Sequence, residues 1–260
     1  MDLKLNGKVV MVTGGAKGIG KGIVLALAAE GAIPVIVGRR QSDNRLVQEE
    51  VESGGGRAYC VEAELTRAEE CERAVRETLA EFGRVDGLVN NAGVNDGVGL
   101  ENGNYQKFVD SLHKSLIHYY LMAHHALPAL KKSRGSIVNI GSKTGETGQG
   151  NTSAYAAANG GRNALTREWA VELLKYGIRV NAVIVAECYT PLYDTWIKTL
   201  SNPAEILEKI TRRIPLGNRM TTAEEIADMV TFLLSERSSH TTGQLIHVDG
   251  GYVHLDRAID

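Results

Sequence analysis

The sequence predicts a single α/β domain with a seven-stranded parallel sheet and helices on both faces. Short runs rich in β-branched residues alternate with amphipathic helical patterns along all 260 residues, as expected of strands joined by helical crossovers. A glycine-rich segment follows the first run and opens the first helical pattern. We find no linker, repeat or low-complexity segment, so residues 1–260 are expected to form one domain.

The expected strands are short apolar runs that end at glycine or polar residues. Pro34 lacks a backbone donor and fits only the first residues of its strand. In chain order the strands cover residues 8–14, 33–40, 57–65, 85–93, 135–142, 178–187 and 242–251.

Between these runs, apolar residues recur at helical spacing. Thr222, followed by Glu224 and Glu225, is a capping arrangement for the last helix. The expected helices cover residues 18–31, 45–56, 68–83, 104–130, 153–177 and 222–236, and residues 190–218 form an irregular stretch with helical pieces.

Composition and charge exclude several classes of protein. The net charge is −2 and the pI is about 6.4, which argues against a nucleic-acid partner. No run is long enough to span a membrane, and the first residues do not resemble a signal peptide. The three cysteines are widely spaced and odd in number, which favours a reducing compartment. We therefore expect a cytoplasmic protein without a membrane or nucleic-acid partner.

The segment TGGAKGIG at 13–20 is a candidate phosphate-binding loop. Gly14, Gly18 and Gly20 let the backbone approach a pyrophosphate, and a helix N-terminus there supplies free N–H groups. The strand before the loop and the helix after it are the context that supports this interpretation. Lys17 and Ile19 belong to the same loop.

The end of the second strand indicates which dinucleotide binds. NAD sites usually place an acidic residue there, whereas this chain has Gly38 followed by Arg39 and Arg40. Arginine matches a 2′-phosphate, and Lys17 is expected on the same side. NADP is therefore the preferred cofactor, and NAD is possible.

Further motifs appear in a fixed order after the glycine loop. They are NNAG at 90–93, a serine that ends the fifth strand (Ser142), Tyr155 at the start of a long helix, RVNAV at 179–183 and DGG at 249–251. Together they resemble the short-chain dehydrogenase/reductase family over essentially the whole chain. The resemblance implies a Rossmann-type domain, nicotinamide-dependent hydride transfer and a homotetramer built on the helices 104–130 and 153–176.

The resemblance also implies roles for individual residues. Ser142 would hydrogen-bond the substrate oxygen, and Tyr155 would exchange its proton. Thr190 would hold the nicotinamide carboxamide. The adenosine would lie against Glu64, Leu65, Asn90, Asn91, Ala92 and Gly93.

The sequence departs from the family pattern at three places. The family lysine that binds the nicotinamide ribose, and whose charge favours ionised tyrosine, is Asn159 here. The helix asparagine that feeds a proton relay is matched by Ser115, and the usual Pro-Gly after the sixth strand is replaced by Val185-Ala186. Asn159 can hydrogen-bond a ribose but supplies no charge.

Several groups could compensate for the missing lysine. The oxidised nicotinamide is itself cationic, a water chain could carry protons, and Lys143 follows Ser142 directly. Lys143 has a second interpretation as a solvated loop residue. Two functional readings remain: a working enzyme with an altered tetrad, or a dinucleotide-binding protein without turnover.

Within the family, five segments resemble the L-fucose dehydrogenase branch: residues 90–100, 142–155, 166–173, 190–197 and the tail 238–258. That resemblance implies oxidation of an aldose at its anomeric carbon to the lactone. A carbonyl reductase acting on 3-oxoacyl or other ketones is the alternative. Polar loops suit a sugar, and the candidate substrate-binding residues are Asn95, Asp96, Lys143, Glu146, Gln149, Asn151, Thr152, Glu187 and Trp196.

Four histidines in the helix 104–130 are spread around its circumference rather than along one face, so no metal site is expected from them. We interpret His113, His118, His124 and His125 as packing, interface or solvent residues, and the neighbouring Tyr119 and Tyr120 suit a subunit interface.

Overall fold

A parallel seven-stranded sheet forms the centre of the protein, as predicted, in a computed structural model that describes residues 1–255. The strand order is β3-β2-β1-β4-β5-β6-β7 and every neighbouring pair is parallel. The order reverses between β1 and β4, which is where doubly wound sheets bind ligands. The strands are β1 Val9–Thr13, β2 Ile33–Gly38, β3 Tyr59–Glu62, β4 Gly87–Asn90, β5 Ser136–Ser142, β6 Arg179–Val185 and β7 Leu245–Val248.

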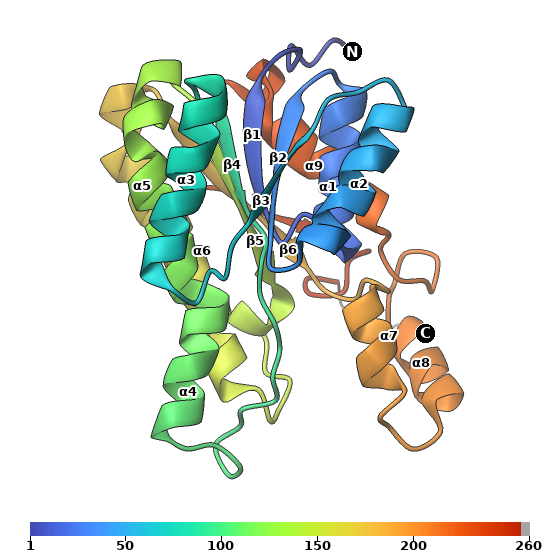
Figure 1. Ribbon diagram of the computed structural model, residues 1–260. Coiled ribbons are helices and arrows are strands. Elements are labelled where there is room, and N and C mark those ends of the chain that lie inside the picture. Colours follow the sequence, from blue (N-terminus) through green and yellow to red (C-terminus); the bar gives the residue numbers. More distant parts are fainter. Residues whose placement is uncertain (256–260) are drawn as a thin grey trace.

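Helices cover both faces of this sheet, and Figure 1 shows the two layers. Alternate residues of β1 serve opposite faces: Val9 and Met11 belong to one apolar cluster, and Val10 and Val12 to the other. One layer contains α1 Gly18–Ala29, α2 Gln41–Ser53 and α9 Ala223–Leu234, and the other contains α3 Ala68–Phe82, α5 His118–Ser133 and α6 Ser153–Glu172.

The predicted helix over 104–130 is instead three segments. The segments are α4 Tyr105–Leu112, a π-helical turn η1 His113–Ile117 and α5. Asn104 caps α4 by accepting a hydrogen bond from the Lys107 backbone N–H at 2.9 Å. A π-turn inside a helix often marks a functional site, and η1 contains Ser115.

The irregular stretch 190–218 contains two helices, α7 Pro191–Ile197 and α8 Pro203–Thr211. They stand apart from the main body at the same end of the sheet as α4, but below the other helical layer (Figure 1). Each begins with proline, which needs no donor in the first turn. Pro34 is the second residue of β2, as expected. Several strands are shorter than their apolar runs, and β3 covers only 59–62 of the expected 57–65.

In the described part of the chain, the helices are too short or too polar to cross a bilayer. The three cysteines are free and buried. Part of the tail that carries the branch resemblance, residues 256–258, lies outside the described residues.

Candidate active site

The candidate site lies where the carboxyl ends of the central strands meet. β1 leads into the glycine loop, β4 into Asn91, β5 ends at Ser142, and β6 leads towards Glu187. Because the strands are parallel, these four ends share one edge of the sheet. The first turn of α6 adds Tyr155.

The glycine loop has the geometry of a dinucleotide cradle. Gly14 and Gly18 have positive φ angles of 65° and 53°, which glycine adopts without strain. A Cβ at Gly20 would lie 2.1 Å from the Gly14 oxygen. Helix α1 has no side-chain cap and no acidic residue in its first turn, so its free N–H groups suit a phosphate. The residues fit the pyrophosphate of NAD(P).

The loop contacts two other predicted cofactor-binding segments. A Cβ at Gly18 would lie 3.1 Å from Thr190 Cγ2, so the loop and Thr190 are neighbours. Asn91 Nδ2 donates to the Thr13 oxygen at 2.8 Å, and the N–H groups of Asn91 and Ala92 donate to Thr13 Oγ1 at 2.8 and 3.1 Å. These bonds fix the turn after β4 against the end of β1.

Asn90 does not point towards this cradle. Its amide is completely buried and donates to Asn139 Oδ1 at 3.0 Å. Asn139 in turn donates to Thr166 Oγ1 at 2.9 Å. The Asn90 side chain therefore joins β4, β5 and α6 inside the core, and the expectation that it lies beside the ribose is wrong.

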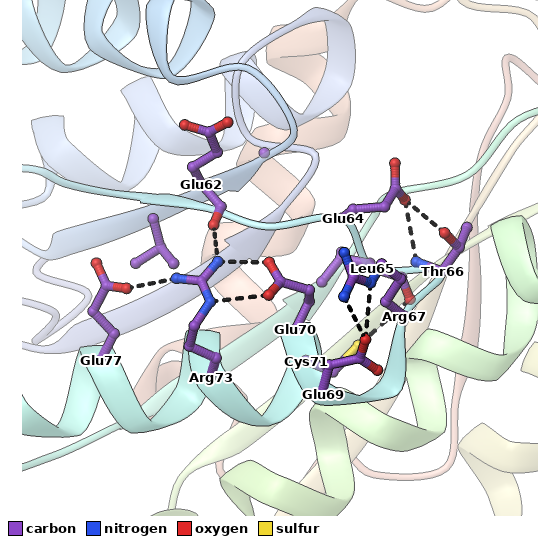
Figure 2. Close-up of polar contacts among 12 residues, drawn as sticks. Glu62, Glu64, Leu65, Thr66, Arg67, Glu69, Glu70, Cys71, Arg73 and Glu77 are labelled. Atoms are coloured by element: carbon purple, nitrogen blue, oxygen red, sulfur yellow. Dashed lines mark hydrogen bonds and ion pairs between the residues drawn. The ribbon is translucent and has the colours of Figure 1, made fainter.

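The expected adenine side of the site lies between β3 and α3 (Figure 2). Leu65 is buried, and the Glu64 carboxylate accepts from Thr66 N–H and Oγ1 at 3.2 and 3.0 Å. Arg73 anchors α3 to β3 by donating to the Glu62 backbone oxygen, and it also donates to Glu70 of its own helix. The Leu65 side chain packs in the apolar core, and its contact with the adenine stays a prediction.

Gly38 has a structural reason to be glycine. A Cβ there would lie 2.3 Å from Asn44 Oδ1, while Asn44 Nδ2 donates to the Gly38 and Val61 oxygens at 3.1 and 3.3 Å. The position usually taken by a ribose-binding carboxylate is therefore filled by Asn44. Arg39 and Arg40 are exposed beside it.

Lys17 is not a free cation. Its ammonium is 2.8 Å from Asp43 Oδ2 in the first turn of α2. Arg39 lies 3.8 Å from Glu64, a distance at which an exposed ion pair is weak. The arginines are thus better placed than Lys17 to receive a phosphate.

Ser142 ends β5 and Tyr155 lies in the first turn of α6, and their catalytic roles stay a prediction. Ser142 Oγ is buried and accepts from Thr144 N–H at 3.3 Å and from Thr144 Oγ1 at 3.2 Å. Tyr155 is half-buried in the first turn of α6. Asn159 lies one turn later, fully buried, and its Nδ2 donates to the Tyr155 backbone oxygen at 2.9 Å.

Ser115 is anchored rather than free. Its hydroxyl donates to the Val94 oxygen at 3.0 Å and accepts from the Val94 N–H at 3.3 Å. Its backbone oxygen accepts from Arg162 Nε at 2.7 Å. The π-turn therefore directs the Ser115 backbone oxygen towards Arg162. A proton relay through the Ser115 hydroxyl stays a prediction.

Arg162 was missed by the sequence reasoning. It is 3% exposed and follows Tyr155 and Asn159 at spacing i, i+4, i+7. That spacing places the three side chains on one helical face. The signal in the sequence was a charged residue on the same helical face as Tyr155 and Asn159.

Lys143 is buried, so its interpretation as a solvated loop residue is wrong. It forms an ion pair with Glu187, and their side chains are 8% and 11% exposed. The Lys143 ammonium lies 4.1 Å from the centre of the Tyr252 ring. Burial and the Glu187 carboxylate raise the pKa of Tyr193. These four residues form a compact polar and aromatic cluster beyond Ser142.

The other candidate substrate-binding residues differ in accessibility. Thr152 is buried immediately before α6. Trp196 is exposed and packs edge-on against Tyr193, with ring centres 5.0 Å apart. Asn95 and Gln149 are exposed. Asn95 accepts from the Gly97 N–H at 3.3 Å, and no hydrogen bond within residues 1–255 joins Asn95 or Gln149 to Ser142 or Tyr155.

Three possible metal ligands lie together elsewhere, at Glu146, His247 and His254, with ligand atoms within 4.8 Å of one another. The sequence reasoning considered only the histidines of the helix 104–130. His247 Nε2 is 3.0 Å from Glu146 Oε2, and its ring packs edge-on against His254. These contacts account for the grouping, so we assign no metal to it.

Comparisons with known proteins agree with this geometry. A family model described as Enoyl-(Acyl carrier protein) reductase matches residues 14–253. L-fucose dehydrogenase of Bos taurus is 36% identical over 252 residues, which cover 96% of this chain and 91% of that protein. The 3-oxoacyl-[acyl-carrier-protein] reductase of Thermotoga maritima is 36% identical over 254 residues, covering 96% and 100%. The crystal structure of Cj0485 dehydrogenase superposes with a TM-score of 0.94 at 47% identity, covering 100% and 99%.

Proposed function

Because this chain belongs to the short-chain dehydrogenase/reductase family, we propose that it oxidises a sugar of the L-fucose type at C1 to the lactone, with NADP as preferred cofactor. The family is one of NAD(P)-dependent oxidoreductases. The sugar substrate and the choice of NADP are the parts that we propose.

The buried Lys143–Glu187 pair carries the proposal of a sugar. Every sugar hydroxyl both donates and accepts, so a cation and a carboxylate side by side serve adjacent hydroxyls. Tyr252 and Tyr193 add flat apolar surface beside them. A buried ion pair is poorly matched to an acyl chain, because desolvated charges gain nothing from apolar contacts.

The chain's own residues suffice for the proton side of the reaction. Ser142 holds the C1 oxygen, and Tyr155 accepts its proton while the hydride leaves the carbon. NAD(P) supplies the hydride acceptor. Gly14, Gly18 and Thr190 would hold the dinucleotide, and the Asn159 amide has the chemistry to bind the nicotinamide ribose.

The preference for NADP is supported by the end of β2. Arg39 and Arg40 are exposed there, and Asn44 occupies the space of an acidic side chain. Without a carboxylate at position 38, a 2′-phosphate can be met by the guanidinium groups of Arg39 and Arg40.

The test is reduction of NADP and of NAD by a panel of aldoses, followed through absorbance of the reduced nicotinamide. The protein is compared with Asn159→Lys, and Tyr155→Phe is the inactive control. Turnover of L-fucose or a close relative by the unchanged chain supports the proposal. If neither protein oxidises an aldose but ketones are reduced in the reverse direction, the carbonyl reductase is favoured. The similarity to the Thermotoga maritima 3-oxoacyl-[acyl-carrier-protein] reductase supports that alternative.

Activity in Asn159→Lys alone would show that the fold and pocket are suited to the reaction but that Asn159 disables it. Tight dinucleotide binding with no turnover in either direction would point to a non-catalytic binding protein.

A further inference from the structure

We infer that Arg162 supplies the positive charge that stabilises the phenolate of Tyr155, in place of the lysine that Asn159 replaces. This inference deepens the proposed function and rests on it for the role of Tyr155 as base. Arg162 acts through Tyr155 and is a positioning residue.

The guanidinium is held in place by neutral acceptors from three elements. Nε donates to the Ser115 oxygen of η1 at 2.7 Å. Nη1 donates to the Ile140 oxygen of β5 at 3.1 Å and to Asn159 Oδ1 at 3.0 Å. The group is 3% exposed. Its position is therefore set by backbone and amide contacts rather than by solvent.

This cation has no ion-paired carboxylate within residues 1–255. An unpaired buried charge is expensive, and such a group attracts any neighbouring group that can become negative. The titratable groups facing it are His118 and Tyr119 from α5 and Tyr155 from its own helix; η1 and β5 contribute only carbonyls.

Of these three groups, only Tyr155 suits the negative charge. Tyr119 is fully buried and donates its hydroxyl to the Ile140 oxygen at 3.0 Å, which favours its neutral form. Burial and the Arg162 charge lower the pKa of His118 to about 3, so it is neutral at pH 7. The Arg162 Cζ lies 6.0 Å from the centre of the half-buried Tyr155 ring.

One nitrogen of the guanidinium is still available. Nη2 is buried and has no hydrogen-bond partner in the described part of the chain. A Cβ at Gly93 would lie 2.7 Å from this nitrogen, so Nη2 points to the backbone beside the expected cofactor site. A buried donor without a partner costs free energy unless a ligand satisfies it.

Asn159 connects the two residues. Its Oδ1 accepts from Arg162 while its Nδ2 donates to the Tyr155 backbone oxygen. An asparagine at this position can satisfy both groups because it donates and accepts. Lys143 is not an equivalent source of charge, because its ammonium is paired with Glu187.

The experiment measures ionisation of Tyr155 without substrate or cofactor. Tyrosinate absorbance is titrated in the unchanged protein, Arg162→Gln, Arg162→Lys and the double variant Arg162→Gln/Asn159→Lys. Each titration is repeated with Tyr155→Phe added, and the difference isolates Tyr155. Melting temperatures and circular dichroism establish that each variant is folded.

We expect Arg162→Gln to move the Tyr155 midpoint upwards by about one pH unit or more, the usual effect of a nearby opposite charge. Arg162→Lys should keep it close to that of the unchanged protein. Adding Asn159→Lys to Arg162→Gln should restore it, because charge rather than shape is replaced. The pH dependence of kcat should shift in parallel.

Two results overturn the inference. One is an unchanged Tyr155 midpoint in Arg162→Gln. The other is a shift in Arg162→Lys as large as that in Arg162→Gln, which would mean that Arg162 has a structural role. If Arg162→Gln does not fold, Asn159→Lys in the otherwise unchanged chain decides. If Arg162 already supplies the charge, Asn159→Lys should change the Tyr155 midpoint only slightly. A fall of one pH unit or more in that variant contradicts the inference. If the protein oxidised no sugar, the result of this titration would not change, and only the proposed function would be contradicted.

Discussion

At the end of β2, Arg39 and Arg40 should decide between the two cofactors. Replacing both by alanine should raise KM for NADP by about 10- to 100-fold, since a hydrogen bond to a charged group contributes ~1.5–3 kcal/mol. KM for NAD should barely change, because NAD has no 2′-phosphate. Steady-state kinetics with each cofactor checks this, and an equal loss with both would show that the arginines do not read the phosphate.

The buried pair of Lys143 and Glu187 should serve binding more than stability. Glu187→Leu alone leaves an unpaired ammonium in a buried site and should lower the free energy of unfolding by about 3–5 kcal/mol. The double variant Lys143→Met/Glu187→Leu should recover most of that loss. Both variants should lose kcat/KM for the sugar. Denaturant unfolding and kinetics separate the effects, and retained sugar turnover in the folded double variant would remove the pair from the substrate site.

From the sequence, Lys143 and Glu187 could be named as candidate site residues, but their burial and pairing could not be predicted. Ser142 ends a strand and Tyr155 lies at the start of a helix, and the family resemblance singles out both residues. Nothing local shows that Lys143 is buried against Glu187, 44 positions away. Arg162 was overlooked because its acceptors come from η1 and β5, which only the folded chain brings together.

Among the helices, α9 is stabilised at its start by a capping box. Thr222 Oγ1 accepts from the Glu225 N–H at 3.2 Å, and the Glu225 carboxylate accepts from the Thr222 N–H at 2.9 Å. Thr222→Ala should lower the free energy of unfolding by about 1 kcal/mol. Thr222→Ser keeps the acceptor and should lose much less. Equal denaturation midpoints for the two variants would contradict a role for the cap.

The start of α5 should make the protein sensitive to acid. The pKa of His118 is about 3 in the folded state, mainly because of burial, and near ~6.5 in the unfolded chain. Below pH 6.5 only the unfolded chain takes up this proton, so the stabilisation is complete above that pH and is lost as pH falls. The free energy of unfolding should decrease by up to ~1.4 kcal/mol per pH unit from this group.

His118→Gln is the matched control for this pH dependence. Glutamine can still donate to the Lys114 oxygen, which lies 3.1 Å from His118 Nε2, but it does not titrate. Denaturant unfolding between pH 5 and 7 should show a shallower slope in the variant. Equal slopes would mean that His118 does not titrate on unfolding.

The break between α4 and α5 shows where helical periodicity is insufficient. The repeat over 104–130 continues through η1 with no proline or glycine to mark the π-turn. The turn occurs where Ser115 is bonded to Val94 and to Arg162, and both contacts come from elsewhere in the chain. Pro128 did not end α5, which continues to Ser133.

For the whole molecule, the seven strands and their parallel arrangement could be predicted, because most strands contain a short apolar run and helical patterns separate them. The exact strand ends could not, since β3 covers only 59–62 of the expected 57–65. The α7 and α8 region was not resolved into separate helices, because both helices are short and few of their residues are buried. The same limit applies to assembly, since an interface depends on which side chains remain exposed after folding.

The exposed face of α5 is where we expect the homotetramer to form. Tyr120 is 51% exposed and stacks on His124 with ring centres 5.7 Å apart, and Ile117 and Phe108 are also partly exposed along the same helical run. Exposed aromatic residues of this kind are typical of interface cores. A carboxylate buried there would be desolvated without a partner, so Tyr120→Glu should dissociate the assembly.

Sedimentation velocity of the unchanged protein and of Tyr120→Glu measures this. Leu46→Glu is the matched control, because Leu46 is equally apolar and 64% exposed but lies on α2 in the other helical layer. We expect a tetramer for the unchanged protein and for Leu46→Glu, and smaller species for Tyr120→Glu. A monomer for the unchanged protein, or a tetramer that survives Tyr120→Glu, would place the interface elsewhere or remove it. Because Arg162 donates to the Ser115 backbone oxygen within this helical run, dissociation should also lower activity by loosening the support of Tyr155.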